Sequence, residues 1–258
     1  MFISSQDLEK IYQDDSVLIL DARSYKDYSK GHIPGSVSLD LFSFHWADTS
    51  QKGLVSFGEH MRKILSYAGI DENKKIIFYD DVSGMLAARG VWMCLYFSHP
   101  DVQMLDGGIS KWTKENLPTQ TESTIYKPSN LTTPLDPSII IGFEELNANI
   151  GKVTILDARS PDEFDGTIPR AARGGHIPTA KNIDWNNNLD DSGKLKSDNE
   201  LQSLYTMDKE YPIVTYCQGA YRAANSYLSL KKIGFKNVKV YLGSWGEWGN
   251  NLKLPIEK

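Results

Sequence analysis

The segment TYCQGAYRAANSYL, residues 215–228, places one of the chain's two cysteines where a strand gives way to a helix. Cys217 follows the apolar run 212–216, which predicts a buried strand, and Arg222 begins a helical pattern. Backbone N–H groups entering a helix lack intrahelical partners, and the helix amino-terminus carries partial positive charge. Arg222 adds a full positive charge that could close over the loop. We therefore predict that Cys217 is a thiolate nucleophile in a loop that stabilises an anionic sulfur.

The short loop between the cysteine and the arginine is the predicted substrate-binding element. Its backbone amides, together with Arg222, are expected to bind an anion, and the residues concerned are Gln218, Gly219, Ala220 and Tyr221. Gly219 permits a close backbone approach and a positive φ. The other cysteine, Cys94, lies in the apolar run 90–97 and is predicted to be a core residue.

Composition and charge restrict the classes of partner. Of the 258 residues, 40% are hydrophobic and 24% charged, which is typical of a globular protein. The net charge of −5 argues against a general nucleic-acid binder but leaves room for a small anionic substrate. We find no secretory leader and no apolar stretch of membrane-spanning length, and two cysteines make no disulfide framework. We therefore expect a cytoplasmic protein without membrane contact, metal or cofactor.

The chain repeats itself with a period close to half its length. Asp-Ala-Arg followed by Gly-His-Ile-Pro occurs from Asp21 and again from Asp157, an offset of 136 residues (157 minus 21). Trp112 and Trp248 are separated by the same offset. The stretch 121–137 is rich in Ser, Thr and Pro and predicts a linker. The duplication thus predicts two similar domains, at residues 1–120 and 138–258.

Each half alternates short β-branched runs with helical patterns. Strands are predicted at 17–20, 75–79, 153–156, 212–216 and 238–241, and helices at 57–69, 87–97 and 222–234. Continuously apolar strands indicate parallel sheets flanked by helices on both faces, an α/β fold. Such sheets bind ligands beyond the carboxyl ends of their strands, where Cys217 lies.

The repeat provides an internal comparison for the candidate site. The loop of the first half has Asp80 and Asp81 where the second has its cysteine, and Leu86 stands in place of Arg222. Only the second domain is therefore predicted to do chemistry. By contrast, the Asp and Arg of the Asp-Ala-Arg motif recur in both halves, which favours a structural role for them.

Taken together, these motifs resemble the two-domain sulfurtransferases of the rhodanese family over nearly the whole chain. The resemblance is carried by the duplicated Asp-Ala-Arg and Gly-His-Ile-Pro motifs, the Cys217 loop, the acidic first-half counterpart and the Gly-Ser-Trp-Gly-Glu-Trp sequence at 243–248. It implies two tandem rhodanese-like domains, with the site of the second facing the domain interface. It also implies that Cys217 takes a sulfane sulfur from a small anionic donor, thiosulfate or 3-mercaptopyruvate. The resulting persulfide would pass this sulfur to a thiol or to cyanide.

The loop and its surroundings depart from the family pattern. The loop is neutral at Gln218 and closes with Arg222, and a substrate-binding arginine that the family often carries is replaced by Asp-Glu-Phe at 162–164. The insertion 166–174 supplies Arg170 and Arg173 instead. We expect Arg173 to bind the anionic end of the donor, with Arg170 or a purely solvated loop as alternatives. Thiosulfate is the favoured donor.

Two other functions compete with sulfur transfer. Cysteine phosphatases also use a strand–loop–helix cradle, but they have five residues between cysteine and arginine, whereas this loop has four. A non-catalytic binding module is the second alternative, and the presence of both Cys217 and Arg222 argues against it.

Overall fold

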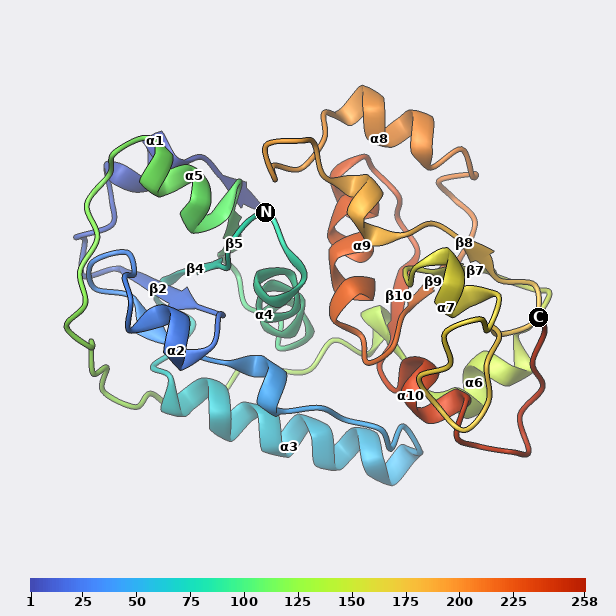
Figure 1. Cartoon of the computed structure of the whole chain (residues 1–258). Coiled ribbons are helices and arrows are strands. Elements are labelled where there is room, and N and C mark those ends of the chain that lie inside the picture. The colour runs from blue at the N-terminus through green and yellow to red at the C-terminus, as the bar shows by residue number, and fades with distance from the viewer. The chain divides into compact units, whose positions relative to one another are not determined.

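The computed structural model describes residues 1–258 and contains two five-stranded sheets, in which every pair of neighbouring strands is parallel (Figure 1). In spatial order the first sheet consists of β1 (Phe2–Ile3), β5 (Val102–Leu105), β4 (Lys75–Tyr79), β2 (Val17–Asp21) and β3 (Val37–Ser38). The second consists of β6 (Ile140–Ile141), β10 (Val238–Tyr241), β9 (Ile213–Tyr216), β7 (Thr154–Asp157) and β8 (Lys181–Asn182). The two orders are the same along the repeat, so the predicted α/β fold with parallel sheets is confirmed.

Helices follow the strands in each half. The first half has α1 (Ser5–Glu9), α2 (Tyr25–Tyr28), α3 (Gln51–Tyr67), α4 (Met85–Tyr96), α5 (Gly108–Lys114) and the 3-10 turn η1 (Leu41–Ser43). The second has η2 (Pro137–Ile139), α6 (Phe143–Ala148), α7 (Pro161–Phe164), η3 (Trp185–Asn188), α8 (Asp198–Leu204), α9 (Tyr221–Lys232) and α10 (Ser244–Trp248). Gly69 and Gly234 take φ values of 84° and 92° just beyond α3 and α9, where a left-handed residue ends a helix.

The chain divides into two compact units. Unit 1 comprises residues 1–44, 58–136 and 189–195, and unit 2 comprises residues 45–57, 137–188 and 196–258. The division passes through α3, and the short segment 45–57 belongs with the second half. The sequence-based boundaries at residues 120 and 138 stay a prediction about the repeat.

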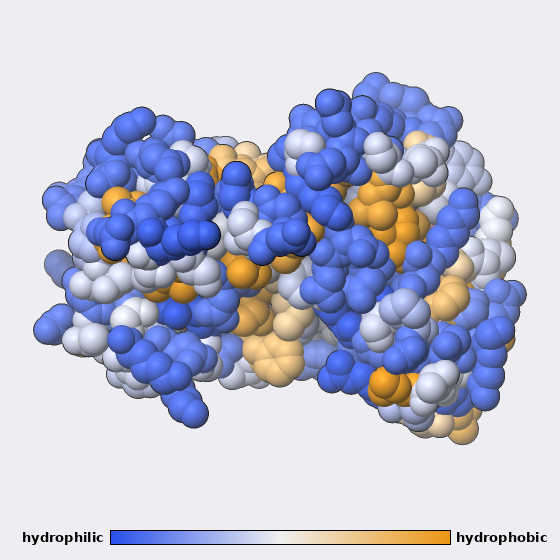
Figure 2. Space-filling model, turned by 45° about the horizontal axis from the view of Figure 1, so that its top comes forward, coloured by the Kyte–Doolittle hydropathy of each residue, from blue (hydrophilic) through white to orange (hydrophobic).

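Each unit has its own apolar core beside its sheet. Ile19 and Ile77 belong to the core of unit 1, and Ile155 and Val214 belong to that of unit 2. The visible face of each unit is largely hydrophilic, with hydrophobic residues in small groups (Figure 2). None of the helices combines the length and the apolar character that crossing a membrane requires.

Two tryptophans show how closely the units repeat each other. Trp112 and Trp248 are fully buried in their respective cores. Their indole N–H groups donate to the carbonyls of Pro118 and Pro255, each at 2.7 Å. A buried tryptophan thus makes the same hydrogen bond, to a proline carbonyl, in both units.

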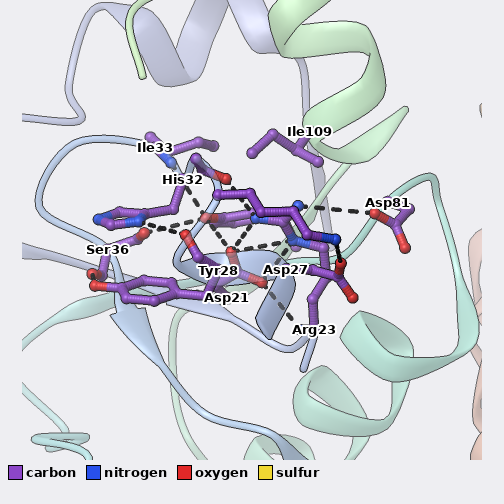
Figure 3. Close-up of polar contacts among 12 residues, drawn as sticks. Asp21, Arg23, Asp27, Tyr28, His32, Ile33, Ser36, Asp81 and Ile109 are labelled. Atoms are coloured by element: carbon purple, nitrogen blue, oxygen red, sulfur yellow. Dashed lines mark hydrogen bonds and ion pairs between the residues drawn. The ribbon is translucent and has the colours of Figure 1, made fainter. Parts of the chain in front are cut away.

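The Asp-Ala-Arg motif ends β2 and β7 with a buried ion pair. Arg23 binds Asp21 through Nη2 and Oδ2 at 2.6 Å and also donates to the carbonyl of Gly31 (Figure 3). Arg159 binds Asp157 at 2.5 Å in the same way. These pairs tie a strand end to the following loop, which agrees with the structural role expected from their recurrence.

Candidate active site

Cys217 lies directly after β9, the central strand of the second sheet. Its backbone N–H donates to Ser244 Oγ at 3.2 Å, and its carbonyl accepts from the Trp245 N–H at 2.9 Å. The carbonyl of Gln218 accepts in turn from the Gly246 N–H at 2.9 Å. The start of α10 therefore holds the backbone of the cysteine loop in place.

The two cysteines are both buried but occupy different surroundings. Cys94 lies within α4 with no exposed surface, and its burial raises the pKa of its thiol well above the usual range. Cys217 is 1% exposed, and it lies within electrostatic range of the Arg222 guanidinium.

The backbone of the loop takes a positive φ at Ala220, which has φ 68° immediately before α9. Gly219, which would permit such a φ without a steric cost, does not adopt one. A left-handed alanine costs about 1–2 kcal/mol. Gly219 serves the close approach, because a Cβ there would lie 1.9 Å from Cε1 of His45.

His45 is a neighbour of the loop that sequence reasoning missed. Its ring lies roughly parallel to that of Tyr221, with centroids 6.2 Å apart and planes inclined by 12°. The segment 45–57 that carries it is fixed to unit 2 by Thr49, whose N–H and hydroxyl both donate to Glu247 at 2.7 and 2.5 Å. The sequence position of His45, in the first half of the chain, gave no signal of this contact.

The guanidinium of Arg222 is bound by a carboxylate from α7. Nη1 and Nη2 donate to the two carboxylate oxygens of Glu163 at 2.5 and 2.9 Å, and the side chains are only 13% and 7% exposed. Burial alone would lower the pKa of Arg222, but the hydrogen bonds to Glu163 and the charge of Cys217 raise it. Burial alone would raise the pKa of Glu163, but Arg222 lowers it to about 2. Both groups are therefore ionised at neutral pH.

The two insertion arginines have different surroundings. The guanidinium of Arg173 donates to four backbone carbonyls of the chain's end, those of Trp248, Gly249, Asn251 and Leu254. These hydrogen bonds occupy the N–H groups of Arg173 within the protein. They therefore do not favour its predicted role in binding the sulfur donor. Arg170 is 54% exposed along its side chain and lies 3.6 Å from Glu163. Arg170, the alternative candidate for binding the sulfur donor, thus lies beside the ion pair of Arg222 and Glu163.

The side chain of Gln218 joins the insertion to the cysteine loop. Its Nε2 donates to the carbonyl of Arg170 at 3.0 Å. Its Oε1 is buried and has no hydrogen-bond partner in the protein. A buried acceptor without a donor costs about 1–3 kcal/mol, so a ligand that donates to this oxygen would remove the penalty.

The equivalent loop of unit 1 already holds an anion. Ile109 and Ser110 donate their N–H groups to the carbonyls of Asp80 and Asp81, as Trp245 and Gly246 do in unit 2, so Asp80 corresponds to Cys217. The Asp80 carboxylate accepts four backbone N–H groups at 2.9–3.3 Å, those of Val82, Gly84, Leu86 and Ala87. This type of loop can therefore surround a negatively charged atom with amides.

Comparisons with known proteins give the chain its family. The rhodanese-like domain matches it twice, over residues 4–115 and 143–251. The chain belongs to the rhodanese family. It is 32% identical over 277 residues to the sulfur carrier protein TtuD of Thermus thermophilus, covering 100% of this chain and 96% of that protein. It is 31% identical over 264 residues to a thiosulfate sulfurtransferase of Azotobacter vinelandii, covering 100% and 97%.

A solved rhodanese structure agrees with this assignment. The crystal structure of SseA from Escherichia coli, described among 3-mercaptopyruvate sulfotransferases, superimposes with a TM-score of 0.81 at 25% identity. It covers 95% of this chain and 98% of its own. The predicted family and fold are thus confirmed, and the relatives support a sulfurtransferase activity for the rhodanese-family chain.

Proposed function

We propose that this protein transfers a sulfane sulfur from thiosulfate to a thiol or to cyanide through a persulfide on Cys217. The observation that carries the proposal is the position of this cysteine, at the carboxyl end of the central strand and within reach of the charge of Arg222. The equivalent position in unit 1 is a carboxylate, so the chain offers one nucleophile of this kind.

The reaction has two steps. The Cys217 thiolate attacks the outer sulfur of thiosulfate, a new S–S bond forms, and the old one breaks to release sulfite with the bonding electron pair. The persulfide then carries the negative charge on its outer sulfur. An acceptor thiolate or cyanide attacks this sulfur, and Cys217 leaves as the thiolate.

The loop supplies the electrostatic part of catalysis. Backbone N–H groups of Gln218, Gly219, Ala220 and Tyr221 are proposed to surround the negative sulfur, and the amide cradle around Asp80 supports this assignment. Arg222 adds the full positive charge. Donors fixed in advance need no reorganisation during the reaction, so they stabilise the developing charge at little further cost.

The anionic end of the donor is proposed to bind Arg170. Its exposed side chain and single contact at 3.6 Å leave its N–H groups free for a ligand. Arg173, the arginine first expected there, donates to four carbonyls instead. The Azotobacter relative is a thiosulfate sulfurtransferase, which supports thiosulfate as the donor. SseA is described among 3-mercaptopyruvate sulfotransferases, which supports 3-mercaptopyruvate as the alternative.

The cellular setting belongs to the same proposal. Both cysteines are unpaired, which supports a reducing, cytoplasmic environment.

Thiocyanate formation from thiosulfate and cyanide tests the proposal. We expect turnover by the wild type, retained turnover by Cys94→Ala and at least about a thousandfold loss in Cys217→Ser, because hydroxyl oxygen cannot replace the thiolate. Turnover that survives in Cys217→Ser would contradict the assignment. Cysteine-dependent hydrolysis of an aryl phosphate without sulfur transfer would favour the phosphatase alternative.

A further inference from the structure

Glu163 is a buried carboxylate beside the cysteine loop that has no place in the reaction described above. It lies at the third position of α7, where it forms a capping box with Ser160. Its two oxygens accept from Arg222, and Arg170 approaches to 3.6 Å. One carboxylate therefore contacts both cations of the proposed donor site.

The cluster of Glu163, Arg222 and Arg170 carries a net charge of about +1, because one carboxylate faces two guanidinium groups. Glu163 offsets the charge of Arg222, so Arg170 remains as the cation whose side chain is largely exposed. Removing the carboxylate would leave two cations facing the donor. The free energy of an ion in a fixed field is proportional to its charge, so a dianion responds about twice as strongly as a monoanion.

We propose that Glu163 is a specificity-determining residue, which lowers the preference of the site for a doubly charged donor over a singly charged one. The inference rests on the proposed function. Thiosulfate carries two negative charges at neutral pH, whereas the carboxylate of 3-mercaptopyruvate carries one. Glu163 therefore reduces the affinity for thiosulfate more than that for 3-mercaptopyruvate and broadens the range of donors.

The repeat shows that this arrangement is particular to unit 2. Asp27 takes the equivalent position in α2 (163 minus 136) and binds Lys30 at 2.7 Å and Ser24 at 2.7 Å. Figure 3 shows Asp27 beside the ion pair of Arg23 in unit 1. Leu86 stands where unit 2 has Arg222, so the position that binds Glu163 in unit 2 offers Asp27 no guanidinium. Only in unit 2 does the carboxylate neutralise a cation of the loop.

The test compares two donors in the full-length protein with cyanide as the common acceptor. The ratio of kcat/KM for thiosulfate to kcat/KM for 3-mercaptopyruvate is measured for the wild type and for Glu163→Gln. We expect this ratio to rise roughly fivefold in E163Q, an order of magnitude set by one partly screened charge. An effect on the reactivity of the sulfur, or a partial loss of folded protein, changes both values together and cancels in the ratio.

Two controls isolate the charge. Glu163→Asp keeps the negative charge and should keep the wild-type ratio. Glu145→Gln removes a charge from the same unit, but Glu145 pairs with Lys239 beside Ile213, at the opposite end of β9 from the loop, and should leave the ratio unchanged. Arg170→Gln removes an exposed cation and should lower the ratio, which provides a second test if E163Q does not fold.

Failure of this inference differs from failure of the proposed function. An unchanged or lowered ratio in E163Q, with both donors still turned over, would overturn the role of Glu163 alone. If E163Q does not fold, an unchanged or raised ratio in Arg170→Gln would do the same. Absence of turnover with both donors in the wild type would instead refute the proposed sulfur transfer.

Discussion

At the scale of single residues, the decisive contact is the ion pair between Glu163 and Arg222. Both side chains are largely buried, so the attraction between them must compensate for the hydration that each charge has lost. Removing one partner from such a pair typically costs about 3–5 kcal/mol, because the remaining charge is buried without compensation. The pair therefore keeps Arg222 charged and in a fixed orientation near Cys217.

The pair predicts a pH dependence of stability. Arg222 holds the pKa of Glu163 at about 2 in the folded protein, below the ordinary value of 4.5. Its stabilisation is therefore present above pH 4.5 and is lost as the pH falls towards 2. We expect Glu163→Gln to lower the free energy of unfolding by about 3 kcal/mol at pH 6 and by less than half of this at pH 3. Urea unfolding of both proteins at the two pH values measures the difference, and an equal difference at both would contradict the pair.

The Glu163–Arg222 pair could not be predicted from the sequence. The two residues are 59 positions apart, and neither a helical period nor a strand period relates them. The capping-box pattern of 160–163 does predict the start of α7, but it does not indicate what the carboxylate contacts. The contacts of Arg173 could not be predicted either, because most of its carbonyl partners belong to an irregular segment whose path the sequence does not reveal.

At the scale of elements, the strand–loop–helix motif occurs twice, with a cysteine in one loop and an aspartate at the equivalent position of the other. In unit 2 the loop presents Cys217, and in unit 1 it surrounds the carboxylate of Asp80. Burial raises the pKa of Asp80 to about 6, while four backbone N–H groups act against this effect. The amides of the first loop thus bind the side chain of Asp80, whereas those of the second are proposed to bind a sulfur anion.

The neighbouring aspartates of unit 1 allow a matched test of this loop. Asp80→Ala leaves four amides without their acceptor, and we expect it to lower the free energy of unfolding by about 2–3 kcal/mol. Asp81→Ala removes a side chain that is 70% exposed and 3.8 Å from Arg23, and it should change stability by less than about 0.5 kcal/mol. Urea titration followed by circular dichroism compares them. Equal losses in the two variants would show that the amide cradle does not stabilise the fold.

Long elements were predictable from the sequence and short ones were not. The central strands β2, β4, β7, β9 and β10 follow β-branched apolar runs, and α3, α4 and α9 follow helical patterns that the sequence shows clearly. The edge strands β1, β3, β6 and β8 have two residues each, too few to produce a period. The segment 45–57 also gave no local signal, because its place beside the second sheet depends on the contact of Thr49 with Glu247.

At the scale of the whole molecule, the duplicated chain has a cysteine in one of its two equivalent loops and an aspartate in the other. The repeat, visible in the sequence, predicted both sheets and the difference between the two loops. We therefore expect each chain to accept at most one transferred sulfur atom, although it contains two cysteines and two rhodanese-like domains. Cys94 should stay unmodified because it is buried within α4.

Intact-mass spectrometry after incubation with thiosulfate and removal of excess donor tests this account most directly. We predict that the wild type and Cys94→Ala each gain one sulfur, about 32 Da, that Cys217→Ser gains none, and that cyanide removes the added mass. No gain in the wild type, a gain of two sulfurs, or a gain that persists in Cys217→Ser would contradict the account.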